Sequence, residues 1–226
     1  MKPYYETPLG KLYHGDCLEI MPQLEPVDLV LTDPPYDKDT HKGGMFTGEI
    51  KFGNVDFPSI NIIPIIGNFL KASNRWVLVF TPIETLGEIK NSYKDSYIRG
   101  GVWDRIVNSP QISGDRPAQG GEGIAILHCP GKKQWNGGGK AGIWRAMVER
   151  NKKQHPTQKP LKLLNELVGQ FSNTGETVLD PFLGSGTTAI ACERLKRKWI
   201  GIEIEEKYCE ISAKRIEAER KQLKLF

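Results

Sequence analysis

The chain has 226 residues, of which 38% are hydrophobic, and this composition suits one compact domain with a sizeable core. The longest apolar run, residues 60–70, is broken by Pro64 and Gly67 and is shorter than the roughly 20 residues that cross a bilayer. The first residues lack the apolar middle of a secretory signal, and the four cysteines form no Cys-x-x-Cys pair. We therefore expect a cytoplasmic protein with reduced thiols, no metal site and no membrane partner.

The net charge of +4 is too small to indicate a polyanionic partner, but its distribution is uneven. Between Pro130 and Pro160 there are eight cations and one anion. Such a local excess is typical of a phosphate-binding surface and equally of a solvated loop.

Apolar runs and helical periodicity alternate along the chain. The expected strands are residues 11–14, 27–32, 75–80, 102–107, 123–128, 177–179 and 199–202. The expected helices are residues 17–24, 60–72, 81–91, 161–171, 187–195 and 205–221. This alternation predicts an α/β fold around a mainly parallel sheet, with a polar, glycine-rich mobile loop at 37–55.

A strand, a glycine turn and the start of a helix follow one another at residues 178–189. Gly184 and Gly186 let the backbone approach a ligand closely, and the start of the helix presents free N–H groups. Glu203 ends the next strand, 23 residues after Asp180, where a carboxylate can accept hydrogen bonds from both hydroxyls of a ribose. The arrangement predicts a nucleoside-binding site.

Several interpretations of this turn compete. A Walker A loop is excluded because no lysine precedes the Thr187-Thr188 pair. A dinucleotide site fits the loose Rossmann spacing, and a tight turn without a ligand is the simplest alternative. Asp180 would repel a diphosphate but pair with the amino group of a methionine moiety, which favours a ligand with that group.

Asp33-Pro34-Pro35-Tyr36 follows the apolar strand at 27–32. The prolines remove two N–H groups and leave an edge rich in acceptors. The Asp33 carboxylate and the Pro34 carbonyl can together accept both hydrogens of an amino group and direct its lone pair at an electrophile. Tyr36 offers a ring on which a flipped base can stack. A Pro-Pro strand stop with a buried tyrosine is the structural alternative.

Four segments resemble the motif set of amino-group DNA methyltransferases: LTDPPY (31–36), HPTQKP (155–160), LDPFLGSGTT (179–188) and GIEIEEKYCEISAKRI (201–216). The tetrapeptide precedes the cofactor loop, which is the order of the β class, and the middle of the chain is similar to small phage and prophage adenine methylases. The resemblance implies S-adenosylmethionine as cofactor and one Rossmann-like methyltransferase domain over 1–226. It also implies a mainly parallel, seven-stranded sheet with helices on both faces and a circularly permuted motif order.

The resemblance assigns roles residue by residue. The catalytic set comprises Asp33, Pro34, Pro35 and Tyr36. The cofactor-binding set comprises Asp16, Cys17, Thr157, Lys159, Asp180, Phe182, Gly184, Ser185, Gly186, Thr187, Thr188 and Glu203. Within this set, Asp16 would accept from the cofactor adenine, Glu203 would hold the ribose, and Thr157 and Lys159 would close over the methionine tail.

The expected partner is duplex DNA, with the target base flipped out to reach Tyr36. A small inserted target-recognition segment is expected at 109–154, and the loop at 37–55 would order around the base. The expected DNA contacts are Lys38, Lys42, Lys132, Lys133 and Trp135. A homodimer and a cognate restriction enzyme are further candidate partners.

Adenine N6 is the favoured target, because aspartate rather than serine at position 33 is the tendency of adenine enzymes in the family. Cytosine N4 methylation is the alternative, since it presents the same chemistry to the same acceptors. An RNA or protein amide methyltransferase and a nucleotide-binding module without turnover are less favoured.

Overall fold

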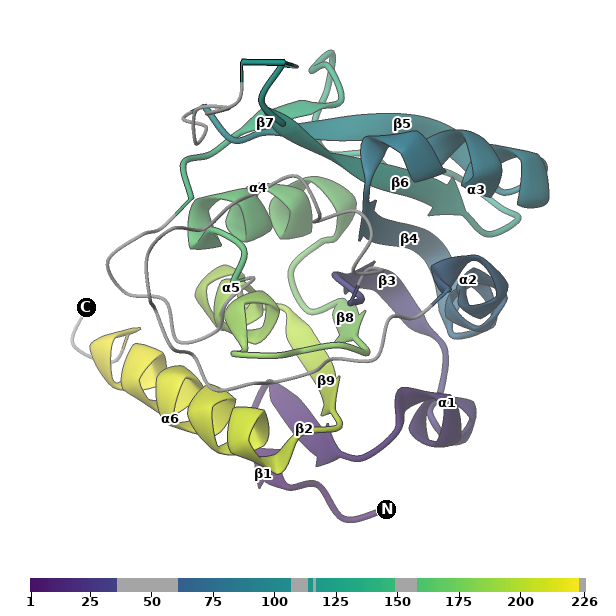
Figure 1. The fold of residues 1–226 in the computed structure, drawn as a ribbon. Coiled ribbons are helices and arrows are strands. Elements are labelled where there is room, and N and C mark those ends of the chain that lie inside the picture. The colour runs from purple at the N-terminus through teal and green to yellow at the C-terminus, as the bar shows by residue number, and fades with distance from the viewer. Residues whose placement is uncertain (36–60, 107–113, 116, 149–157, 224–226) are drawn as a thin grey trace.

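The structure is a computed structural model that describes residues 1–35, 61–106, 114–115, 117–148 and 158–223. Its strands are β1 (Tyr5–Glu6), β2 (Gly10–His14), β3 (Val27–Thr32), β4 (Ser73–Thr81), β5 (Tyr97–Asp104), β6 (Gly121–His128), β7 (Ile143–Arg145), β8 (Thr177–Asp180) and β9 (Lys198–Glu203). Its helices are α1 (Cys17–Ile20), α2 (Ile62–Lys71), α3 (Leu86–Ser92), α4 (Leu161–Phe171), α5 (Thr187–Leu195) and α6 (Glu206–Leu223), with 3₁₀ turns at Met21–Gln23 and Ile83–Thr85 (Figure 1).

Over these described residues, the strands form one nine-stranded sheet in the order β1-β2-β9-β8-β3-β4-β6-β5-β7. The five strands from β2 to β4 in this order run parallel, whereas β6 is antiparallel to both β4 and β5. The seven expected strands are all present, and β1 and β7 extend the sheet as short edge strands. The predicted α/β Rossmann-like fold is confirmed.

Strands β3 and β8 are neighbours at the centre of the sheet although about 150 residues separate them in the chain. Leu29 pairs with Val178 and Val30 with Leu179. The two motif-bearing strands are therefore adjacent, as the permuted motif order predicts. Because both run parallel, the segments that follow them emerge at the same edge of the sheet.

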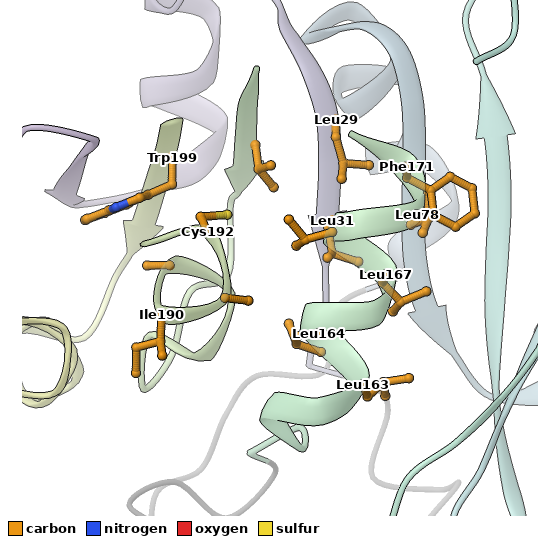
Figure 2. Packing of buried hydrophobic residues seen from close by; sticks show 14 of the residues in the cluster. Leu29, Leu31, Leu78, Leu163, Leu164, Leu167, Phe171, Ile190, Cys192 and Trp199 are labelled. Atoms are coloured by element: carbon orange, nitrogen blue, oxygen red, sulfur yellow. The ribbon is translucent and has the colours of Figure 1, made fainter. Parts of the chain in front are cut away.

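Helices cover both faces of the sheet, with α1, α2 and α3 on one face and α4, α5 and α6 on the other (Figure 1). In α4, leucines at helical spacing and Phe171 form one apolar stripe, which packs on Leu29, Leu31 and Leu78 of β3 and β4 (Figure 2). Burying each leucine contributes roughly 1.5–3 kcal/mol. The stripe fixes α4, and with it the residues just before the helix, against the middle of the sheet.

One strand prediction was inaccurate, and strand β7 was not predicted. The strand expected at 102–107 is β5, which begins at Tyr97 and ends at Asp104; two glycines inside it dilute the apolar pattern. Gly101 is required there because a Cβ would lie 2.6 Å from the Trp144 ring of β7. Strand β7 has three residues and lies in the basic stretch, so it is too short for a periodic pattern that would predict it.

The predicted recognition segment at 109–154 contains β6 and β7, which belong to the sheet. It is therefore not one inserted unit, and its role in target recognition stays a prediction. The loop expected at 37–55 lies outside the described residues. Among the helices that the structure describes, none is long and apolar enough to cross a membrane.

Candidate active site

Acidic side chains gather where the parallel strands end. Glu203 is the last residue of β9, Asp180 the last of β8, and Asp33 follows β3 directly. Asp16 lies two residues beyond β2, where it caps α1 by accepting a hydrogen bond of 2.7 Å from the Leu18 N–H. Register places these strand ends side by side, so four predicted site residues share one edge of the sheet.

Asp180 is almost completely buried beneath the glycine turn. Its Oδ1 accepts a hydrogen bond from the Phe182 N–H at 3.1 Å, and its Oδ2 accepts one from the Thr188 hydroxyl at 2.6 Å. Burial raises the pKa of this carboxyl from 3.8 to about 7, and the two hydrogen bonds only partly oppose that shift. A cationic ligand group nearby would favour the charged form.

The turn after β8 requires glycine at two positions. Gly184 and Gly186 have φ values of 53° and 84°, in the left-handed region that other residues seldom adopt. A Cβ at Gly186 would also lie 2.8 Å from the Cβ of Ser212 in α6. The backbone therefore passes close to α6 before Thr187 begins α5, and the free N–H groups of that helix face the site edge.

Glu203 supports this turn from the neighbouring strand. Its Oε2 accepts a hydrogen bond from the Gly184 N–H at 2.8 Å, and its Oε1 accepts one from the Glu205 N–H at 2.9 Å. The side chain is buried, and burial raises its pKa. Each carboxylate oxygen has a second lone pair, so the group can hold the turn and still accept from a ribose hydroxyl.

Arg215 of α6 is a residue that the sequence did not single out. Its guanidinium donates to the Ser185 hydroxyl at 2.8 Å and to the Ser185 carbonyl, and it approaches the Thr187 hydroxyl at 3.4 Å. The Ser185 hydroxyl also donates to Gln158 Oε1 at 3.3 Å. The cofactor turn is thus tied both to α6 and to the segment before α4.

Lys159 lies between two carboxylates. Its Nζ is 2.5 Å from Asp33 Oδ2 and 2.9 Å from Glu122 Oε1. Burial alone would lower the lysine pKa, but the two carboxylates outweigh burial and raise it, so the ammonium is retained. The contact of Lys159 with the methionine tail stays a prediction, whereas its contact with Asp33 was not foreseen.

The remaining site predictions fall into three groups. Pro34 and Cys17 are buried at this edge, Pro35 is half-buried, and Phe182 packs edge-on against Phe69 at 6.4 Å. Burial raises the pKa of the Cys17 thiol to about 12, so it stays protonated at neutral pH. A second group lies outside the described residues: Tyr36, Lys38, Lys42 and Thr157.

Lys132, Lys133 and Trp135 lie at the opposite edge of the sheet from Asp33. They follow β6, whose last residue, His128, pairs with Trp76 near the start of β4. Trp135 is half-buried against Phe171, with ring centroids 4.8 Å apart. This placement removes the geometric support for contacts between these three residues and DNA beside the target base.

The family model for DNA methylases, N6_N4_Mtase, matches residues 73–214, well over half of the chain. The chain belongs to this family. It is 39% identical to the type II methyltransferase M.HpaI of Haemophilus parainfluenzae, over 92% of this chain and 74% of that protein. It is 28% identical to the type II methyltransferase M.HinfI of Haemophilus influenzae, over 96% of this chain and 70% of that protein.

Solved structures agree with the fold of this DNA methylase. The M1.HpyAVI–SAM complex matches with a TM-score of 0.72 and 25% identity, over 91% of this chain and 99% of that one. The cytosine-N4-specific PvuII DNA methyltransferase matches with a TM-score of 0.72 at 18% identity, over 96% and 93% of the two chains, which shows the fold alone. The protein is a DNA amino-methyltransferase that depends on S-adenosylmethionine.

Proposed function

We propose that this protein methylates the exocyclic N6 of an adenine that has been flipped out of duplex DNA. The observation that carries the proposal is the position of Asp33. It follows β3, beside the strand whose end bears Asp180 and the cofactor turn. An acceptor for the target amine and a site for the methyl donor therefore open onto the same edge of the sheet.

The chemistry required of Asp33 follows from the nature of the target. The amino group of adenine is a poor nucleophile, because its lone pair is delocalised into the ring. The Asp33 carboxylate and the Pro34 carbonyl would accept its two hydrogens, draw the nitrogen towards sp³ geometry and orient the lone pair. The nitrogen would form a bond to the methyl carbon as the bond from that carbon to the donor sulfur breaks, which would leave a neutral thioether, and the nitrogen would then release one proton to water. Tyr36 would stack on the flipped base.

The residues around the glycine turn fit S-adenosylmethionine. When bound, this cofactor supplies an electrophilic methyl group on a sulfonium. Asp180 would pair with its ammonium, Glu203 would accept from the ribose hydroxyls, and Asp16 would accept from the adenine amine. The buried Asp180 supports this fit, because burial raises its pKa to about 7 and a bound ammonium would favour the charged carboxylate.

Adenine is proposed over cytosine because position 33 is aspartate, the tendency of adenine enzymes of the β class. Cytosine N4 is the second candidate, because the cytosine-N4-specific PvuII enzyme has the same fold. For DNA recognition we propose the parts of 109–154 that precede β6 or follow β7, with Lys38 and Lys42 near phosphates. A homodimer and a cognate restriction enzyme remain part of the proposal.

The direct test incubates the purified protein with unmethylated DNA and S-adenosylmethionine and identifies the methylated nucleosides by mass spectrometry. N6-methyladenine is the expected product. N4-methylcytosine would keep the chemistry and replace the target base. Cofactor binding without any methylated nucleoside would point to an RNA or protein substrate, or to a binding module without turnover.

A further inference from the structure

Glu122 has no role in the assignments above, yet it is one of the most buried acids in the described part of the chain. It lies at the start of β6, where it pairs across the sheet with Trp103 near the end of β5. Gly123, the next residue, pairs with Thr81 at the carboxyl end of β4. The sheet therefore carries Glu122 to the same edge as Asp33.

Glu122 and Asp33 share the ammonium of Lys159, which is 2.9 Å from Glu122 Oε1 and 2.5 Å from Asp33 Oδ2. The second Glu122 oxygen, Oε2, accepts from Arg105 at 2.7 Å. Despite burial, the two cations hold the pKa of Glu122 below its usual value. Two carboxylates thus face two cations in one cluster.

Aromatic rings fix the position of the shared ammonium. Lys159 Nζ lies 4.9 Å from the centroid of the Phe80 ring and 5.8 Å from that of Trp103. Rings at these distances attract a cation and also exclude water from it. The lysine is therefore held by its surroundings as well as by Asp33, and it can stay in place when Asp33 turns to another donor.

We propose that Glu122 is a positioning residue that retains Lys159 and so leaves the Asp33 carboxylate available as an acceptor for the target amine. This inference rests on the proposed function of Asp33. Without the Glu122 charge, Lys159 would keep only Asp33 of these two carboxylates, and Arg105 would lose its pairing with Glu122. The carboxylate would then be a weaker acceptor, and a net positive charge would oppose the positive charge that develops on the methylated nitrogen.

Two substitutions at this position separate charge from shape. Glu122→Gln keeps the shape and removes the charge, whereas Glu122→Asp keeps the charge and shortens the side chain. The single-turnover rate of methyl transfer at saturating DNA and S-adenosylmethionine should fall about 10- to 100-fold in Glu122→Gln and less in Glu122→Asp. Affinity for S-adenosylmethionine should change by less than about twofold in both variants.

Glu176→Gln is the matched control. Glu176 forms an ion pair of 2.7 Å with Arg75 just before β8, at the opposite edge of the sheet. Its removal tests the loss of a comparable ion pair away from the site, and its transfer rate should stay within about twofold of the wild type.

A Glu122→Gln variant with the wild-type rate would overturn the inference. So would a Glu122→Asp variant slower than Glu122→Gln, because that order would mean that shape matters more than charge. A rate loss matched by an equal loss of cofactor affinity would overturn it as well. If the wild type itself transfers no methyl group, or Asp33→Ala transfers at the wild-type rate, the proposed function fails first.

Discussion

Thr188 donates a hydrogen bond of 2.6 Å from its hydroxyl to Oδ2 of Asp180, across the glycine turn between β8 and α5. The bond joins the last residue of a central strand to the first turn of the helix that follows it. It orients one carboxylate oxygen while burial raises the pKa of the group to about 7. The charge state of Asp180 near neutral pH therefore depends on what lies next to it.

Affinity for S-adenosylmethionine should weaken as the pH falls below about 7. The cofactor ammonium favours the ionised carboxylate, and below its pKa the free protein holds Asp180 protonated, so binding must first release that proton. The loss should approach about tenfold per pH unit. Calorimetric titration between pH 5 and 8 measures it, with Asp180→Asn as the control, which should bind weakly and with little pH dependence. A wild-type affinity that is flat over this range would contradict the assignment of Asp180.

Glu203→Ala should weaken cofactor binding by roughly 10- to 100-fold, because a charged acceptor for the ribose is lost. It should also lower the free energy of unfolding by about 1–3 kcal/mol, since the Gly184 and Glu205 N–H groups lose their partner. The identity of the methylated base should not change. Calorimetry measures the cofactor affinity, denaturant unfolding measures the stability, and nucleoside analysis identifies the methylated base. An unaltered cofactor affinity would refute the ribose assignment.

Gly186→Ala should destabilise the protein more than Gly175→Ala does. Both glycines have positive φ, 84° and 82°, so both substitutions carry a backbone cost of about 1–2 kcal/mol. Only at Gly186 would the new Cβ meet a neighbour, the Ser212 Cβ at 2.8 Å, which adds about 1–3 kcal/mol. Urea unfolding compares the two variants, and equal losses of stability would show that the close packing against α6 has no energetic role.

Lys132→Ala combined with Lys133→Ala should leave DNA affinity and its salt dependence nearly unchanged, because both residues lie at the edge opposite Asp33. Two lost phosphate contacts would flatten the slope of log affinity against log salt by about 2. Fluorescence anisotropy at several salt concentrations measures that slope. A flattening of this size would place the opposite edge in the DNA interface.

The parts of the site that the sequence predicted are those where a strand meets its own following turn. Asp33, Asp180 and Glu203 each end a strand or follow it at once, and a parallel sheet brings such ends together. Strands β3 and β8 could be predicted from their continuous apolar runs, because both strands are buried on both faces.

The parts that the sequence did not reveal depend on contacts between distant segments. Glu122 reaches the site through the pairing of β6 with β4 and β5, and nothing near it in the chain signals that register. The contact between Lys159 and Asp33 spans 126 residues. Strand β7 is too short for a periodic pattern, and its place beside β5 depends on backbone pairing with that strand and on the close approach of Gly101 and Trp144.

The most direct test of the account removes the Asp33 carboxylate and measures methyl transfer and cofactor binding together. Lys159 keeps its contact with Glu122 in Asp33→Ala, so this buried cation stays paired and the protein should fold. We predict that single-turnover transfer to DNA falls at least about 100-fold while the Kd for S-adenosylmethionine stays within about twofold. Near-normal transfer by Asp33→Ala would contradict the assignment of this carboxylate to the target amine.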